Sequence, residues 1–211
     1  MRTLRTAICT LEPQLIEHSH EMFAVLSDPA IYEFENARPA SEEWLAERFA
    51  RLETRGLKNG QEHWLNWVIR LPSAELAGYV QATLLPKHAA YVAYELASKF
   101  WRRGIGRDAV SAMESELINE YDVHTLVAVL KARNFRSSAL LSSLGFAVGT
   151  PGESVNFEPE QDEIVMLKNV VQTRMRPNPS IERTRAGSAL QALISFWALR
   201  ALPPRAAQLK R

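Results

Sequence analysis

The stretch Phe100-Trp101-Arg102-Arg103-Gly104-Ile105-Gly106-Arg107 decides how this chain folds. Two glycines one residue apart let the backbone approach a ligand without interference from a Cβ atom. Apolar residues then recur at helical spacing and predict a helix over 106–121: Val110, Met113, Leu117 and Tyr121. The first-turn N–H groups of a helix attract anions, and three arginines add positive charge. The stretch therefore predicts a phosphate-binding loop at a helix start.

Two helices and a run of strands are predicted before this loop. Apolar spacing indicates helices over 14–26 and 42–54, the second of them capped by Ser41. Aromatic and β-branched residues then fill three segments separated by short turns: 63–70, 76–85 and 89–97. Three such segments in succession predict an antiparallel meander.

The remaining segments add strands around one more helix. A strand is predicted over 5–11, and three follow the loop's helix, at 125–130, 146–148 and 163–167. A helix over 137–144 lies between the first two of those three. Strand–helix–strand units joined to a meander indicate an α/β (α+β) domain. We expect a mixed central sheet of about seven strands, flanked by about four helices.

The loop fits neither common nucleotide-binding motif. No Gly-Lys-Ser/Thr follows it, as a Walker loop requires, and the third glycine of the dinucleotide-binding fingerprint is absent. It resembles instead motif A of the GNAT acetyltransferases, a (Gln/Arg)-x-x-Gly-x-(Gly/Ala) loop between a strand and a long helix. Trp101 stands where that pattern has Gln or Arg, and Arg102 replaces a glycine common just after it. We expect Arg102 to be tolerated with its side chain pointing outward.

A second set of residues matches the same family. Asn134, Ser137 and Leu144-Gly145-Phe146 follow its Asn-x-x-Ser…Leu-Gly-Phe pattern, and Leu26-Ser27-Asp28-Pro29 with Tyr32 resembles the RimJ/RimL-like branch. The resemblance spans about residues 5–168 and implies the GNAT acyl-coenzyme A N-acyltransferase fold, with acetyl-coenzyme A as co-substrate. The cofactor contacts that it implies come from Tyr94, Leu96, Trp101, Arg102, Arg103, Gly104, Ile105, Gly106, Arg107, Asn134 and Ser137.

The resemblance says less about the catalytic acid and base. Relatives place a tyrosine seven residues after the motif asparagine, to protonate the leaving thiolate, but this chain has Leu141 there. Ser137, or else Ser138, is then the candidate acid, unless these serines only bond the local backbone. The candidate bases are Glu95, Glu33, Glu35 and His63. Strand alternation could turn Glu95 away from the acceptor, and the other three could be ordinary surface or strand-edge residues.

The implied reaction is direct attack of a primary amine on the acetyl thioester in a ternary complex. The acceptor would be a protein N-terminus, a polyamine or a small-molecule amine such as an antibiotic. The alternative is a non-catalytic GNAT-fold module that binds coenzyme A or a protein partner, which the vacant tyrosine position leaves open. A homodimer also stays open.

Composition limits the class of protein. Of the 211 residues, 46% are hydrophobic and 23% are charged, as in soluble globular proteins. Cys9 is the single cysteine, so we expect no internal disulfide. The five histidines show no ligand spacing with cysteine or acid, so we expect no metal. The N-terminal residues lack the apolar stretch of a signal peptide, which predicts a cytoplasmic protein.

Charge divides the chain into two parts. Residues 173–211 hold eight basic residues and one acid, whereas 1–172 hold 17 basic and 23 acidic residues. We therefore expect a GNAT acetyltransferase domain over 1–172 and a basic, weakly ordered tail over 173–211. The acidic domain argues against a nucleic-acid partner.

The tail resembles the product of a reading frame that runs into an integron gene cassette's recombination site. Its apolar stretch, 189–202, is too short to span a bilayer, so no stable membrane insertion is expected. The stretch is either an accidental segment or a marginal amphipathic helix.

Overall fold

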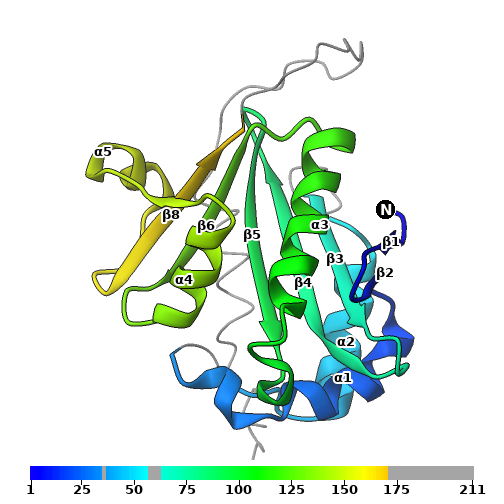
Figure 1. Ribbon diagram of the computed structural model, residues 1–211. Helices are drawn as coiled ribbons and strands as arrows, with labels where there is room; N and C mark the ends of the chain where they lie inside the picture. The colour runs from blue at the N-terminus through cyan, green and yellow to red at the C-terminus, as the bar shows by residue number, and fades with distance from the viewer. Residues whose placement is uncertain (35–36, 57–62, 171–211) are drawn as a thin grey trace, which may run out of the picture. The chain divides into compact units, whose positions relative to one another are not determined.

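The computed structural model describes residues 1–34, 37–56 and 63–170 (Figure 1). Their strands form one mixed sheet in the order β1-β2-β3-β4-β5-β6-β8-β7. The strands are β1 (Leu4–Arg5), β2 (Thr10–Pro13), β3 (His63–Arg70), β4 (Leu76–Leu85), β5 (Ala89–Leu96), β6 (Thr125–Lys131), β7 (Ala147–Val148) and β8 (Glu163–Asn169). The α-helices are α1 (Ser19–Leu26), α2 (Glu42–Glu53), α3 (Ile105–Glu120), α4 (Phe135–Ser143) and α5 (Pro151–Ser154). Short 3-10 helices are η1 (Ile16–His18), η2 (Pro29–Tyr32), η3 (Ser98–Phe100) and η4 (Val155–Phe157).

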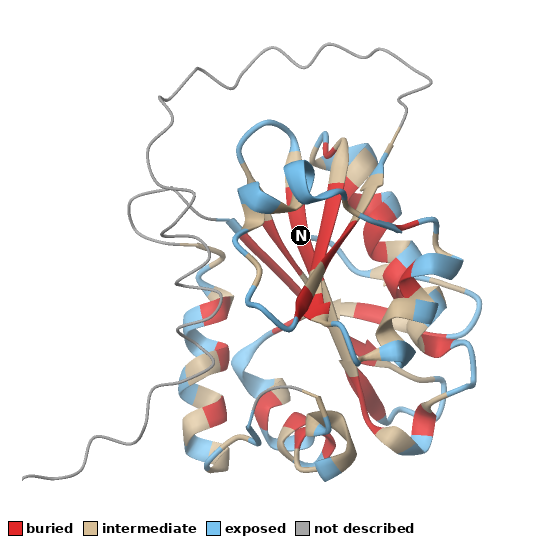
Figure 2. Ribbon diagram, turned by 90° about the vertical axis from the view of Figure 1, so that its left-hand side faces the viewer, coloured by how far each residue is buried: buried red, intermediate tan, exposed pale blue. Residues whose placement is uncertain are grey.

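Helices cover both faces of the sheet. In Figure 1, α3 and α4 lie in front of the strands, and α1 and α2 lie behind them. Helices α1, α2 and α3 bury apolar residues against the sheet, which Figure 2 shows as red faces turned inward. The stripe of α3 includes Val110, Met113 and Leu117, and that of α2 includes Leu45 and Phe49. Two layers of helices therefore enclose the strands that carry the site.

The parallel pairing of β5 with β6 ends early. Their register runs only from Ala89↔Thr125 to Tyr91↔Val127, whereas β6 stays paired with β8 along its full length. The two strands start together at the top of Figure 1 and diverge downward. The last residues of β5 consequently have no strand partner on the β6 side.

The predicted α/β fold is confirmed, with differences at the ends of elements. Strands 63–70 and 76–85 and the Ser41 cap, whose Oγ accepts the Trp44 N–H at 3.1 Å, match the predictions. The single first strand predicted over 5–11 is wrong. Thr6 Oγ1 accepts the Cys9 N–H at 2.9 Å, and this turn separates β1 from β2. The described sheet therefore has eight strands rather than about seven, and α5 was not predicted. Among the described helices, none is both long and apolar enough to cross a membrane.

Candidate active site

Gly104 begins α3 in a left-handed conformation, with φ of +79°. A residue with a Cβ atom would pay about 1–2 kcal/mol for that conformation. No side chain caps the helix, and its first backbone bond runs from the Asp108 N–H to the Gly104 oxygen at 3.0 Å. The N–H groups ahead of Asp108 are therefore free to bind an anion. A Cβ atom on Gly106 would lie 3.2 Å from Leu140 Cδ1, so this glycine lets the loop pass close to α4.

Positive charge surrounds this helix start. Arg102, Arg103 and Arg107 are exposed, and none of them takes part in an ion pair with another described residue. Arg102 has a φ of +59°, which explains why glycine is common at its position in the family pattern. Its exposure matches the expectation that its side chain points outward. This arrangement favours an anionic group such as phosphate.

The end of β5 presents backbone groups to the gap between β5 and β6. Ala97 donates its N–H to the Ala77 oxygen on β4, at 3.0 Å. Because backbone groups alternate sides along a strand, those of Tyr94 and Leu96 point the other way, toward the gap. Trp101 Nε1 donates to the Leu96 oxygen at 2.9 Å, which ties the loop to the strand. The Leu96 N–H faces the gap.

The start of α4 borders the same gap. Asn134 Oδ1 accepts the Ser137 backbone N–H at 3.1 Å and caps the helix. The Tyr94 hydroxyl donates to the Ser137 carbonyl oxygen at 3.5 Å, and burial raises the pKa of Tyr94 to about 12. Leu141, at the vacant tyrosine position, is 2% exposed and belongs to the core.

Glu95 lies on the opposite face of β5 from Tyr94 and Leu96. It is the cross-strand neighbour of Tyr79 and hydrogen-bonds its hydroxyl. Burial, and then the Glu95 charge, raise the pKa of Tyr79 well above its usual value and also raise that of Tyr32. Because Tyr32 belongs to η2, which follows α1, Glu95 faces the α1/α2 side of the sheet. The side chains of Tyr94 and Leu96 thus lie on one face of β5 and the Glu95 side chain lies on the other.

Of the other candidate bases that the structure describes, Glu33 lies near the phosphate-binding loop and His63 lies far from it. Glu33 forms an ion pair with Arg136 Nη1 of α4 at 2.5 Å, and the Arg136 guanidinium lies 4.8 Å from the Trp101 ring centroid. His63 is exposed at the first residue of β3, at the opposite end of the sheet from Leu96. Glu35 lies outside the described residues.

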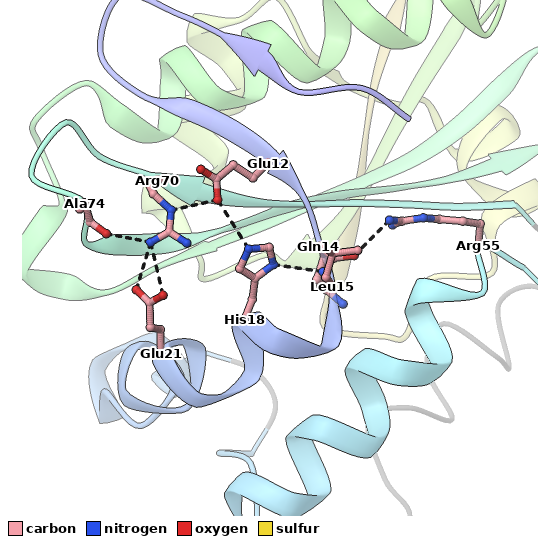
Figure 3. Close-up of polar contacts among 8 residues, drawn as sticks. All are labelled: Glu12, Gln14, Leu15, His18, Glu21, Arg55, Arg70 and Ala74. Carbon is pink, nitrogen blue, oxygen red and sulfur yellow. Dashed lines mark hydrogen bonds and ion pairs between the residues drawn. The ribbon is translucent and has the colours of Figure 1, made fainter.

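A cavity of about 610 Å³ lies elsewhere, between the ends of β2 and β3 and η1. Its lining includes Arg5, Glu12, His18 and Arg70. Figure 3 shows that Glu12 and Glu21 already pair with Arg70. None of the residues expected to bind the cofactor lines this cavity, and we do not assign the cofactor to it.

One set of side chains was missed by sequence reasoning. His88, Asp122 and His124 meet at the surface although their spacing along the chain suggested no ligand set. The one local signal was Asp122-x-His124, because His88 reaches them only through the fold.

Comparison with known families identifies the fold. The model described as "Acetyltransferase (GNAT) domain" matches residues 9–147. The chain therefore belongs to the GNAT acetyltransferase family, whose members are N-acetyltransferases that use acetyl-coenzyme A. The search of curated proteins returned no match.

Solved structures share the fold at low sequence identity. A ribosomal-protein-S5-alanine acetyltransferase from Vibrio fischeri has 18% identity and a TM-score of 0.65, with 79% of this chain and 96% of that chain covered. RimL, a ribosomal L7/L12 alpha-N-protein acetyltransferase solved with coenzyme A, has 14% identity and a TM-score of 0.62, with 80% and 98% covered. A GNAT-family acetyltransferase from Bacillus anthracis has 13% identity and a TM-score of 0.62, with 79% and 98% covered.

Proposed function

We propose that this protein transfers an acetyl group from acetyl-coenzyme A to a primary amine at the diverging end of β5. The observation that carries the proposal is the uncapped, arginine-flanked start of α3 beside the gap between β5 and β6. These features suit acetyl-coenzyme A. The free N–H groups and the guanidinium groups can bind its pyrophosphate, and the unpaired edge of β5 can bind the amides of its pantetheine arm. Acetyl-coenzyme A, when bound, supplies the acetyl thioester.

Each residue of the cofactor side has a distinct role in this proposal. The N–H groups of Ile105, Gly106 and Arg107 hold the pyrophosphate, together with the guanidinium groups of Arg102 and Arg103. The backbone groups of Tyr94 and Leu96 pair with the pantetheine amides as an added strand would. The Leu96 N–H faces the thioester oxygen and stabilises the negative charge that develops there. Asn134 and Ser137, at the start of α4, lie beside the pantetheine arm. Trp101 holds the Leu96 carbonyl in place by its hydrogen bond.

In this proposal the catalytic acid and the catalytic base act from opposite faces of the sheet at β5. Glu95 takes a proton from the attacking amine on the α1/α2 side. Ser137 donates a proton to the departing sulfur on the α4 side, in place of the tyrosine that Leu141 replaces. Tyr79 holds the Glu95 carboxylate by its hydrogen bond.

The acceptor in this proposal is the α-amine of a protein N-terminus. Two of the structural neighbours are named as acetyltransferases of ribosomal proteins, one of them as an alpha-N-protein acetyltransferase. The acidic composition of residues 1–172 also suits a cationic amine. The alternative acceptors are a polyamine and a small-molecule amine such as an antibiotic.

Calorimetry with acetyl-coenzyme A tests the cofactor site. Gly104→Glu should abolish binding, because it places a like charge at the pyrophosphate position and a side chain at a left-handed φ. Gly152→Glu is the matched control, since a Cβ atom at exposed Gly152 meets nothing within 4 Å, and it should bind normally. A folded wild-type protein that binds no acetyl-coenzyme A contradicts the proposal.

The same preparation tests catalysis. Glu95→Gln should bind acetyl-coenzyme A as the wild type does, yet lose on the order of 10²-fold or more in the rate of transfer to an N-terminal peptide. Binding by the wild-type protein without transfer to any of a panel of peptides, polyamines and small amines would favour the non-catalytic module.

A further inference from the structure

Three potential metal ligands converge at the end of the sheet where β5 and β6 start together. His88 lies in the turn before β5, and Asp122 and His124 lie between α3 and β6. His88 Nδ1 lies 3.0 Å from Asp122 Oδ2, and His124 Nε2 lies 3.0 Å from Asp122 Oδ1. One ligand atom from each residue falls within 4.8 Å of the other two.

We propose that His88, Asp122 and His124 form a binding site for a divalent transition-metal ion such as Zn²⁺, held by two imidazole nitrogens and one carboxylate oxygen. Ligand atoms of a tetrahedral zinc site lie about 3.3 Å apart, since zinc–nitrogen bonds are about 2.0 Å long. The two His–Asp separations are already close to that spacing. The two imidazole planes are nearly parallel here, so the rings must rotate about their side-chain bonds before both nitrogens face one ion.

The backbone holds the ligands in place before an ion binds. The His124 N–H donates to the His88 carbonyl oxygen at 2.6 Å, which ties the two loops together. The imidazole rings are stacked, with centroids 4.6 Å apart and an angle of 10° between their planes. His88 and Asp122 both adopt left-handed backbone conformations, with φ of +58° and +54°. Fixing the loops in this way lowers the entropy lost when an ion binds.

The donor set selects the class of ion. Two imidazoles and a carboxylate suit zinc, copper or nickel, whereas calcium and magnesium require oxygen ligands. The side chains of His88, Asp122 and His124 are 56%, 61% and 39% exposed, so ions reach them freely. Three protein ligands leave a fourth zinc position for water.

The site is separate from the proposed acetyl-transfer site. The eight residues of β5 lie between His88 and the phosphate-binding loop, a length of roughly 25 Å. An ion here joins the β4–β5 turn to the α3–β6 connection and stabilises the folded protein, because the unfolded chain holds no such arrangement.

Zinc titration of the untagged full-length protein tests the proposal. Calorimetry with ZnSO₄ at pH 7.5 should show saturable binding of one ion, and the melting temperature should rise with zinc. His88→Gln, Asp122→Asn and His124→Gln should each weaken binding by about tenfold or more. His20→Gln is the matched control, because His20 also contacts a carboxylate, Glu42 at 2.9 Å, but has no third ligand among the residues that the structure describes.

A spectroscopic measurement on the wild-type protein does not depend on any variant folding. Long-range ¹H–¹⁵N spectra of the histidine rings should report zinc at Nδ1 of His88 and at Nε2 of His124. No saturable binding, equal zinc affinity in wild type and the three variants, or zinc-induced shifts confined to other histidines would each overturn the proposal.

Discussion

At Gly78 the missing side chain determines how closely β4 approaches β5 beside the proposed base. A Cβ atom on this residue would lie 1.9 Å from the Glu95 carbonyl oxygen and 2.9 Å from Leu96 Cα. Both are backbone atoms, so no side-chain rotation can relieve the overlap. Gly78 therefore fixes the path of β5 at the two residues that we assign to oxyanion stabilisation and proton transfer.

Gly78→Ala should lower the free energy of unfolding by about 1–3 kcal/mol, because the two strands must separate to admit the methyl group. Urea denaturation measures the change. Gly152→Ala is the control, since its Cβ atom meets nothing within 4 Å and alanine favours the helical conformation of α5. Equal stability of Gly78→Ala and wild type would show that β5 shifts at no cost.

Sequence predicts single residues well where the local backbone decides their role. The left-handed Gly104 could be anticipated from its place before a helical apolar pattern, and so could the Ser41 cap. Gly78 gave no such signal, because its constraint comes from a carbonyl oxygen on a neighbouring strand. The bond from Trp101 Nε1 to the Leu96 oxygen and the meeting of His88 with His124 also depend on the tertiary fold.

At the scale of elements, one histidine joins β2, η1 and α1 (Figure 3). His18 Nδ1 accepts the Leu15 N–H at 3.1 Å, and Nε2 lies 3.5 Å from Glu12 Oε2. Burial lowers the pKa of His18, although the Glu12 carboxylate opposes this shift. The geometry agrees, since a proton on Nδ1 would break the bond that holds the start of η1.

This arrangement predicts a pH dependence of stability. Because the pKa of His18 is lower in the folded protein than in the unfolded chain, the unfolded chain takes up its proton first as pH falls. The contribution of His18 is complete above the unfolded pKa of about 6.5 and is lost as pH falls below it. The stability advantage of wild type over His18→Gln should therefore shrink between about pH 7 and pH 5, as measured by urea denaturation at each pH.

Gly152→Ala is the control for this titration. It adds and removes no ionisable group at an open position, so it should leave the pH profile of stability parallel to that of wild type. A constant difference between wild type and His18→Gln across the same pH range would contradict the assignment.

Elements whose apolar residues recur with a clear period could be predicted from the sequence. Elements whose ends depend on a few polar hydrogen bonds could not. The aromatic and β-branched segments of β3 and β4 have the predicted bounds. The first strand was wrong because one hydroxyl, Thr6 Oγ1, turns the backbone within an otherwise apolar stretch. The helix predicted from Ser137 begins at Phe135, because Asn134 caps it.

At the scale of the whole molecule, the candidate active site depends on the point at which the pairing of β5 with β6 ends. The sequence predicted the strands but not that β5 and β6 share only three register pairs. The structure shows this divergence directly. Glu95 lies on the opposite face of β5 from Tyr94 and Leu96. Strand alternation alone had left the direction of the Glu95 side chain undecided. Three statements stay predictions: the division of the chain into domains 1–172 and 173–211, the homodimer, and the cassette origin of the tail.

Removal of residues 173–211 should leave the affinity for acetyl-coenzyme A unchanged. The described residues that our proposal assigns to the site lie between Tyr79 and Ser137, and the last strand, β8, ends at Asn169. Val170 adds one further bond, from its N–H to the His124 oxygen at 2.8 Å, which the shortened chain keeps. Calorimetry on chains 1–172 and 1–211 measures the comparison.

A shorter chain, 1–162, is the control for this deletion. It lacks β8, whose seven residues pair with β6 from Glu163↔Lys131 to Asn169↔Thr125, and it should not fold. The two truncations therefore place the domain boundary between residues 162 and 172. A large loss of affinity in chain 1–172 with its melting temperature unchanged would instead assign part of the basic tail to the coenzyme A site, where its arginines would add to those around Gly104.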